Sequence, residues 1–263
     1  MNKKLLLLIS LFLGLCSTHR LQAQCDSSYV SELLKTGQWL GSLIFGGVEV
    51  TEEKEEEIGD QMFAYVQSNF TLLESDSRLT KLQKILNTMT PHVSRKGIQY
   101  DIHLIQNSDL INAFSIAGGH IFITTGIMNW VESDDELAFI IGHEIGHVDL
   151  GHTIQHIKKS MTIQSWADYL QLNEYAGVIE QAQTILGTPF GQPDEYSSDQ
   201  YGATIALKAG YNPHKGKDFF KKLSENEKKE DIPYDLDVWM RTHPYSDQRI
   251  ICLDYFIRNE LKK

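Results

Sequence analysis

The residues of this chain best suited to chemistry are two histidines four positions apart with a glutamate between them. His143, Glu144 and His147 form an HExxH box. On an α-helix, residues four apart lie on one face, one turn above each other. Both imidazoles could then bind a single ion, and Glu144 would project beside them toward a water in an open coordination position. This is the arrangement of a zinc hydrolase with a general base, holding one Zn²⁺ per chain.

A box this short also arises by chance, so its surroundings matter. Residues 139–141, Ile145 and Val148 are apolar, and no proline interrupts the stretch. The pattern therefore predicts a buried helix, where an unpaired set of two histidines and a glutamate would be costly. A satisfied core histidine explains one such residue but is a poor explanation of all three.

A catalytic zinc ion usually has three protein ligands and one open position. A third histidine six residues after the box is missing, because Gly151 and His152 each come one position early. We therefore expect His152 to be structural. Glu195 and Asp199 offer the other solution, because they share a helix face and one could bind zinc while the other fixes a ligand imidazole through its ring N–H. On spacing alone these acids could equally be a solvated helix face, but the upstream box favours a site.

Most of the elements that must position these residues are predicted to be helical. Apolar spacing, caps and breakers predict helices at about 51–69, 75–90, 194–209, 213–223 and 246–261, and a helix for the box that is capped by Ser133 or Asp134. Residues 98–105 alternate like a half-buried strand, and 112–123 read as strand, glycine turn, strand. The stretch 152–186 is a mixed helical pattern, either a mobile lid or a packed helical pair, and 224–235 is predicted to be a loop. The expected fold is α+β, mostly helical, with a small sheet beside the HExxH helix.

The second strand of that glycine turn is a candidate substrate strand. It contains Gly119, His120, Ile121 and Phe122. A strand ahead of an HExxH helix is a usual place for a peptide to add by backbone hydrogen bonds. We expect His120 to be a surface or hairpin residue and not a zinc ligand.

The chain begins with a predicted signal peptide over residues 1–23. Lys3 and Lys4 precede an apolar run at 5–15, and residues 21–23 offer a cleavage site. A lipoprotein signal with a lipid anchor at Cys16 is the minor alternative, because a bulky leucine precedes that cysteine. We expect 24–263 to form a single domain that is periplasmic or otherwise exported, with no integral membrane span after cleavage.

The charge and the cysteines limit partners and chemistry further. The chain has 24 basic and 35 acidic residues, with a formal net charge of −11, which argues against nucleic acid and anionic membrane surfaces as partners. Beyond the predicted leader, Cys25 and Cys252 could form one disulfide in an oxidising compartment or stay as separate thiols. The chain has no Cys-x-x-Cys motif, so a thiolate zinc site is not indicated.

Four groups of residues together resemble the zinc metallopeptidase family forty-eight, the family of HtpX-type heat-shock proteases and CAAX prenyl proteases, and above all its secreted single-domain bacterial members. Their order and spacing agree with the family over residues 50–255. Ser198, where the family usually has alanine, is one departure, and the membrane spans and helical-repeat domain of other members are missing. The matching groups are 112–114 with 118–122; 136–148 with His152; Glu195 with 199–202 and 209–213; and 242–244 with 249–250.

The resemblance implies a gluzincin-type endopeptidase that binds zinc through His143, His147 and Glu195. It places His243 beside the metal, either as the donor that shares the developing oxyanion charge or as a fourth ligand that holds the enzyme latent. Tyr201 and Arg249 are the other candidate donors. In a competing interpretation, His243 and Arg249 only brace Asp199 and the last helix.

We therefore expect a zinc-dependent endopeptidase that cleaves polypeptides, with misfolded or unassembled envelope proteins as the expected substrates. The alternatives are a zinc-bearing periplasmic chaperone-like binder and a latent protease with little intrinsic cleavage. Glu144 argues against a pure binder, which has no need of a general base.

Overall fold

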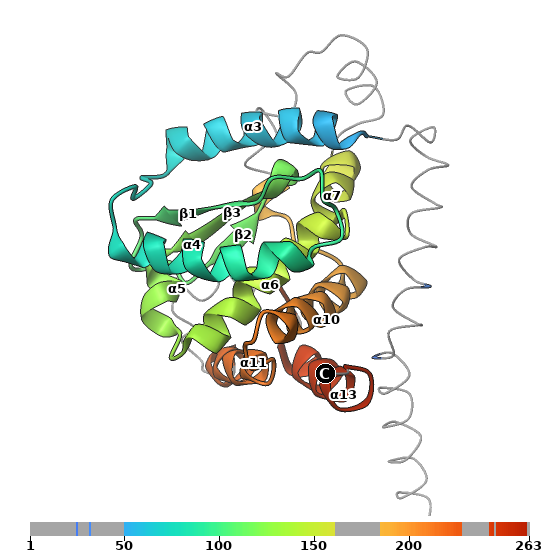
Figure 1. Ribbon diagram of the computed structural model, residues 1–263. Coiled ribbons are helices and arrows are strands. Elements are labelled where there is room, and N and C mark those ends of the chain that lie inside the picture. Colours follow the sequence, from blue (N-terminus) through green and yellow to red (C-terminus); the bar gives the residue numbers. More distant parts are fainter. Residues whose placement is uncertain are drawn as a thin grey trace, which may run out of the picture.

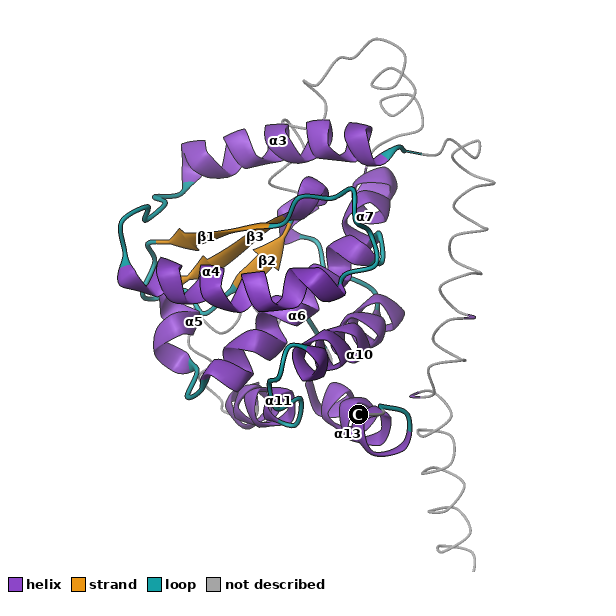
Figure 2. Cartoon of the chain, viewed as in Figure 1, coloured by secondary structure: helices purple, strands orange, loops and turns teal. Residues whose placement is uncertain are grey.

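Helices surround a small three-stranded sheet in this computed structural model, which describes residues 25, 32, 50–160, 185–227, 242–244 and 246–261 (Figures 1 and 2). The predicted α+β class is therefore confirmed. The predicted signal peptide, Cys16 and most of the predicted lid fall outside the described residues.

The first half of the described chain supplies the sheet and its covering helices. The helices are α3 (Glu52–Asn69), α4 (Ser77–Met89), η1 (Thr90–His92), η2 (Ala117–Gly119) and α5 (Thr125–Trp130), and the strands are β1 (Asp101–Ile105), β2 (Ala113–Ser115) and β3 (His120–Thr124). Thr51 caps α3 as predicted, since its hydroxyl accepts a hydrogen bond from the Lys54 backbone N–H at 3.2 Å.

The second half is helical in its described parts. It contains α6 (Asp134–Asp149), α7 (His152–Ser160), α10 (Gln192–Lys208), α11 (Lys215–Glu227) and α13 (Ser246–Asn259). The cap of α6 is Ser133, whose hydroxyl accepts from the Glu136 backbone N–H at 3.2 Å. The prediction of a loop from residue 224 was wrong at its start, because α11 continues to Glu227.

The strand order is β1-β3-β2, so β3 is the central strand. It runs parallel to β1, with Asp101 opposite His120, and antiparallel to β2. Side chains alternate between the two faces. On one face, Phe122 packs with Met62 of α3. On the other, Ile121 belongs to the main core with residues of α4 and α6. Figure 1 shows α3 on one side of the sheet and α4 and α6 on the other.

The helix α6 lies at the centre of the structure and packs most extensively on α10. All of its residues from Glu136 to Asp149 are buried, as predicted for an apolar HExxH helix. Small residues let the two backbones approach: a Cβ added at Gly142 would lie 3.0 Å from the Cα of Gly202, and one at Gly146 would lie 3.1 Å from the Cα of Ser198. Side chains beside this crossing are therefore brought face to face.

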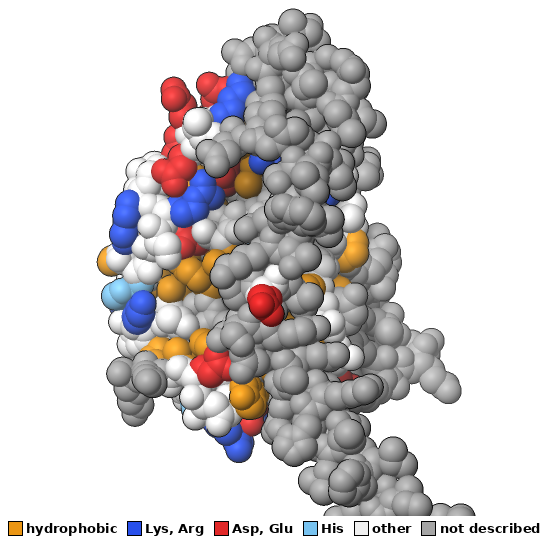
Figure 3. Space-filling view, turned by 90° about the vertical axis from the view of Figure 1, so that its right-hand side faces the viewer, with side chains coloured by type: hydrophobic (Ala, Val, Ile, Leu, Met, Phe, Trp, Pro, Cys, Tyr) orange, Lys and Arg blue, Asp and Glu red, His pale blue; other side chains and the backbone are white. Residues whose placement is uncertain are grey.

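The first turn of α3 carries several acidic residues. Figure 3 shows acidic side chains toward the top of the described part of that face, at the level of α3 in Figure 1, with basic ones among them. These acidic residues do not all lie on a solvated face as expected, because Glu55 is 1 % exposed and its carboxylate pairs with Arg95 at 2.8 Å. None of the described helices combines the length and the apolar composition that a membrane span requires.

Cys25 and Cys252 form a disulfide with a Cα–Cα distance of 4.7 Å. The sequence left pairing and free thiols as equal alternatives, and the structure has the pair. The bond joins the N-terminal part of the chain to α13, across 227 residues of sequence. Tyr196 of α10 belongs to the same buried cluster as the two cysteines.

Candidate metal centre

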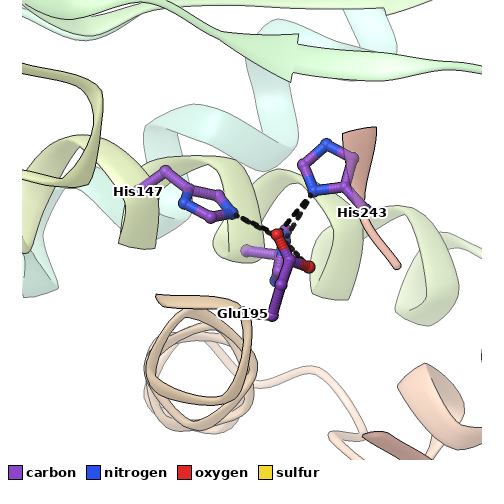
Figure 4. A group of neighbouring side chains, drawn as sticks. His147, Glu195 and His243 are labelled. Carbon is purple, nitrogen blue, oxygen red and sulfur yellow. Dashed lines mark hydrogen bonds and ion pairs between the residues drawn. The ribbon is translucent and has the colours of Figure 1, made fainter. Parts of the chain in front are cut away.

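Four side chains that can bind a metal meet at the crossing of α6 and α10. His143 and His147 come from α6, Glu195 from the first turns of α10, and His243 from the segment before α13. Each offers one ligand atom, and these atoms all lie within 4.8 Å of one another. All four side chains are at most 1 % exposed. Figure 4 shows His147, Glu195 and His243 pointing toward a common centre.

The separations between the ligand atoms suit a tetrahedral zinc ion. Nε2 of His143 lies 3.0 Å from Nε2 of His147 and 3.4 Å from Nδ1 of His243. The carboxylate of Glu195 lies 3.5 Å from His147 and 3.2 Å from His243. Zinc bonds to nitrogen and oxygen of about 2.0–2.1 Å put the corners of a tetrahedron about 3.3 Å apart. The observed separations of 3.0–3.6 Å lie around this value.

The charges of the cluster also fit a cation. Two imidazole nitrogens 3.0 Å apart turn their lone pairs toward each other, which is favourable only with a cation or a proton between them. Burial lowers the pKa of both histidines well below the ordinary value, and Arg249 adds to this at His143, so neutral imidazoles face the centre. Burial alone would raise the pKa of Glu195, but Arg249 and His243 hold it well below the usual range, as a metal-binding carboxylate requires.

Each histidine of the box has a partner at its other ring nitrogen. Oδ1 of Asp199 lies 2.9 Å from Nδ1 of His143, which directs Nε2 of that ring to the centre. Nδ1 of His152 lies 3.2 Å from Nδ1 of His147. His152 thus supports a box histidine, a contact that the sequence analysis missed.

Arg249 is fully buried behind the cluster. Its guanidinium donates two hydrogen bonds to Asp199, at 2.9 and 2.7 Å, and pairs with Glu195 at 2.5 Å. It also donates to the backbone carbonyl of His243 at 3.2 Å. The guanidinium is thus engaged by Asp199, Glu195 and the backbone of the His243 segment.

Glu144 lies beside the cluster with one oxygen held and one open. Its Oε2 accepts a hydrogen bond from the Ser115 hydroxyl at 2.9 Å. Its Oε1 is buried and has no hydrogen-bond partner among the described residues, and it lies 3.6 Å from Nε2 of His243. Burial raises the pKa of Glu144. A carboxylate with a raised pKa and an open acceptor is suited to general acid–base work.

Phe190 covers the cluster from the side of the segment before α10. Its ring stacks on His147 with centroids 3.9 Å apart, and its backbone N–H donates to the Thr242 carbonyl at 3.3 Å. A small cavity, lined largely by apolar side chains, opens beside His243. Its lining residues are Met62, 114–117, Thr153, His156, Ile157, 185–186, Thr188, Phe190, Thr242 and His243.

Two sequence-based placements were wrong. Tyr201 is not near an oxyanion position, because its hydroxyl donates to Asp149 at 2.5 Å. The strand that begins at His120, with Ile121 and Phe122, cannot accept a substrate by backbone hydrogen bonds, because β1 and β2 occupy both of its edges, and Gly119 belongs to η2. In the described part of the chain, β2 has a strand partner on one side only.

The fold is mostly helical, and the HExxH helix and a later glutamate meet at one buried cluster. These features define the class of metallopeptidases with two histidines and a glutamate at the metal. The chain belongs to peptidase family M48, whose model matches residues 76–257. That match contains the box, Glu195 and His243.

Curated relatives agree with this family. The chain is 30 % identical over 160 residues to the mitochondrial metalloendopeptidase OMA1 of Arabidopsis thaliana, which covers 59 % of this chain and 31 % of that protein. It is 22 % identical over 210 residues to the β-barrel assembly-enhancing protease of Escherichia coli, 75 % of this chain and 42 % of the relative. It is 24 % identical over 195 residues to metalloprotease LoiP of Escherichia coli, 71 % and 76 % of the two chains. The chain thus spans less than half the length of the first two relatives.

Proposed function

We propose that this chain is a zinc-dependent endopeptidase that binds one Zn²⁺ through His143, His147 and Glu195. The observation that carries the proposal is the buried cluster of these ligand atoms with separations of 3.0–3.6 Å, beside a glutamate with an open oxygen. Zinc held there would supply Lewis acidity that activates a water and polarises the peptide carbonyl.

The side chains around the cluster have distinct tasks in this proposal. Glu144 takes a proton at Oε1 and later passes it to the leaving amine, while Ser115 fixes its other oxygen. Burial alone would lower the pKa of His243, but the carboxylates of Glu195 and Glu144 raise it above the ordinary value. A protonated His243 could therefore donate a hydrogen bond to the developing oxyanion. Asp199 and Arg249 hold the ligands in place.

In place of β3, we propose β2 as the substrate strand, along the edge that has no strand partner among the described residues. Ser115 of β2 contacts Glu144 directly, so a peptide added along this strand would pass the general base. Phe114 and Ile116 line the apolar cavity next to His243. That cavity suits an apolar substrate side chain near the cleaved bond.

Polypeptides of the cell envelope are the proposed substrates, and export is the proposed location. Three observations support this proposal. They are the predicted signal peptide, the disulfide, which fits an oxidising compartment, and the name of the Escherichia coli relative, which refers to β-barrel assembly. An unfolded protein such as casein is a suitable test substrate.

Metal removal tests the proposal. Dialysis against a zinc chelator should abolish casein cleavage, and stoichiometric Zn²⁺ should restore it, whereas Mg²⁺ should not, because imidazole ligands suit zinc. The His147→Gln variant should show no cleavage at the same zinc concentration. Cleavage that survives both the chelator and this substitution would contradict a zinc peptidase.

The position of His243 supports a second possibility, a latent protease. Its Nδ1 lies at a fourth corner of the cluster, 3.2 Å from Glu195 and 3.4 Å from His143, where a water would otherwise sit. If His243 blocks this corner, His243→Ala should raise casein cleavage. If His243 is the oxyanion donor, the same change should lower kcat about 100-fold or more while zinc content stays constant.

A further inference from the structure

A second group of metal-ligand side chains lies on the opposite face of the sheet. Asp101 and His103 are two residues apart on β1 and so project from the same face, and His120 is the register partner of Asp101 on β3. Asp101, His103 and His120 each offer a ligand atom, and these atoms lie within 4.8 Å of one another. The cluster of His143, His147, Glu195 and His243, called the catalytic cluster from here on, lies on the α6 side of the sheet. The group around Asp101 lies on the α3 side.

One carboxylate already draws the two imidazoles together. Oδ1 of Asp101 lies 2.8 Å from Nδ1 of His120, and Oδ2 lies 3.1 Å from Nε2 of His103. Asp60 of α3 lies on the outer side of His120, with Oδ1 3.5 Å from Nε2. Burial opposes ionisation of Asp101, but the two histidines hold its pKa well below the usual range, so it is a carboxylate at neutral pH.

The two rings are held firmly. Phe63 of α3 stacks on His120 with centroids 4.9 Å apart and planes 14° apart, and it lies 4.6 Å from the ring of His103. The side chains of His103 and His120 are 20 % and 13 % exposed, so an ion could reach them from solvent. A rigid group with access from solvent loses little conformational freedom when it binds an ion.

The nitrogen of His103 is the strongest indication of a ligand. Nε2 is buried and has no hydrogen bond of acceptable geometry in the described part of the chain, although the Asp101 carboxylate is close. A buried polar atom without a hydrogen bond is costly. Coordination of a cation would use its lone pair and keep the attraction to the carboxylate.

We propose that Asp101, His103 and His120 form a second metal site, which binds a divalent transition ion of the zinc type. Two imidazoles and a carboxylate are ligands that zinc and copper ions accept readily, whereas magnesium and calcium prefer oxygen alone. The ion would join β1 to β3 next to α3, and the remaining coordination positions would be open to water or Asp60. The site is independent of the catalytic cluster and takes no part in the proposed cleavage.

Metal counting tests this proposal. The protein, purified without a histidine tag, is dialysed against micromolar Zn²⁺ and its metal content is measured. We expect one more equivalent per chain in the wild type than in His103→Gln/His120→Gln, where glutamine keeps the size of the side chains. The control His92→Gln/His214→Gln removes two histidines elsewhere and should bind as much zinc as the wild type. Equal metal content in the wild type and His103→Gln/His120→Gln would overturn the site.

A spectroscopic measurement adds a test on the wild type, whose result does not depend on the stability of the variant. Cu²⁺ is added at one equivalent to wild type that carries a single equivalent of Zn²⁺, enough to fill the catalytic cluster. It should give an electron paramagnetic resonance signal with coupling to two imidazole nitrogens. The signal should lose that coupling in His103→Gln/His120→Gln and keep it in His92→Gln/His214→Gln. A wild-type signal without nitrogen coupling, or one unchanged in His103→Gln/His120→Gln, would contradict the proposal.

Discussion

Gly202 of α10 lies directly against His143 of α6: a Cβ added at Gly202 would be 2.8 Å from the backbone nitrogen of His143. Real Cβ atoms do not come this close to a backbone atom, so any side chain at Gly202 must push the helices apart. The candidate metal ligands His143 and His147 lie on α6, and the candidate ligand Glu195 lies on α10. Their relative position therefore depends on a residue that has no side chain of its own.

The first prediction follows from this contact. Gly202→Ala should lower the free energy of unfolding by about 1–3 kcal/mol, as overpacking does. It should also weaken zinc binding, because Glu195 moves with α10. Urea unfolding and a competitive zinc titration measure the two effects. The matched control is Gly187→Ala, since a Cβ added there meets no atom within 4 Å. Equal zinc affinity in Gly202→Ala and the wild type would disprove the dependence.

The second prediction concerns the buried Arg249. Loss of its guanidinium in Arg249→Ala leaves the carboxylates of Glu195 and Asp199 without their cation, which should cost about 3–5 kcal/mol of stability. Arg249→Lys should recover only part of this, because lysine cannot bind two carboxylates with a planar fork. Denaturant unfolding of metal-free protein measures the loss.

A surface pair on the same helix provides the control. Arg258 pairs with Asp254 at 2.8 Å, but its side chain is 69 % exposed. Arg258→Ala should change stability by at most about 1 kcal/mol. A similar loss in both variants would show that burial of Arg249 does not matter.

The third prediction concerns acid stability. The carboxylate of Asp149, at the end of α6, accepts hydrogen bonds from the backbone N–H groups of Ser94 and Arg95 and from the hydroxyls of Tyr100 and Tyr201. Burial opposes ionisation, but these donors hold the pKa of Asp149 below its usual value. The contribution of ionised Asp149 to the free energy of unfolding is therefore complete above the unfolded-state pKa of about 4. It is lost as the pH falls through the lower, folded-state pKa.

Asp149→Asn should thus cost about 2 kcal/mol or more at pH 7, and the difference from the wild type should shrink as the pH falls below about 4. Urea unfolding at a series of pH values measures both. A constant difference across this range would argue against an ionised Asp149.

The fourth prediction concerns the disulfide. Because Cys25 and Cys252 close a loop of 227 residues, Cys252→Ser should lower stability by about 2–5 kcal/mol. The wild type in reductant should match the variant, and the variant itself should not respond to reductant. Thermal unfolding with and without reductant makes the comparison. A wild type that is indifferent to reductant, with its thiols shown to be free, would contradict this role of the bond.

The sequence predicted the residues of the cluster more completely than the residues that hold them in place. His143, Glu144 and His147 follow from spacing within one helix, and Glu195 and Asp199 from spacing within another. The contact of His152 with His147 was not predicted, because a helix continued past the box would put His152 on a different face. In the structure α6 ends at Asp149, Gly151 adopts a positive φ of 74°, and α7 starts at His152. This turn brings the His152 ring back to His147, and no periodicity encodes it.

The order of the strands was also beyond local patterns. Alternation identified residues 98–105 and the glycine turn as strands, but it cannot tell a central strand from an edge strand. That depends on β1, distant in sequence, pairing with β3. For the same reason the sequence did not bring together Asp101, His103 and His120, which meet only through that register.

The most direct test of the zinc peptidase compares the wild type with Glu144→Gln on casein, after both have been shown to bind the same amount of zinc at the catalytic cluster. Glutamine keeps the shape of Glu144 but cannot accept the proton. We expect cleavage by the wild type and a loss of at least about 100-fold in the variant. Equal cleavage by the two proteins, at equal zinc content, would contradict the role of Glu144 and with it the proposed mechanism.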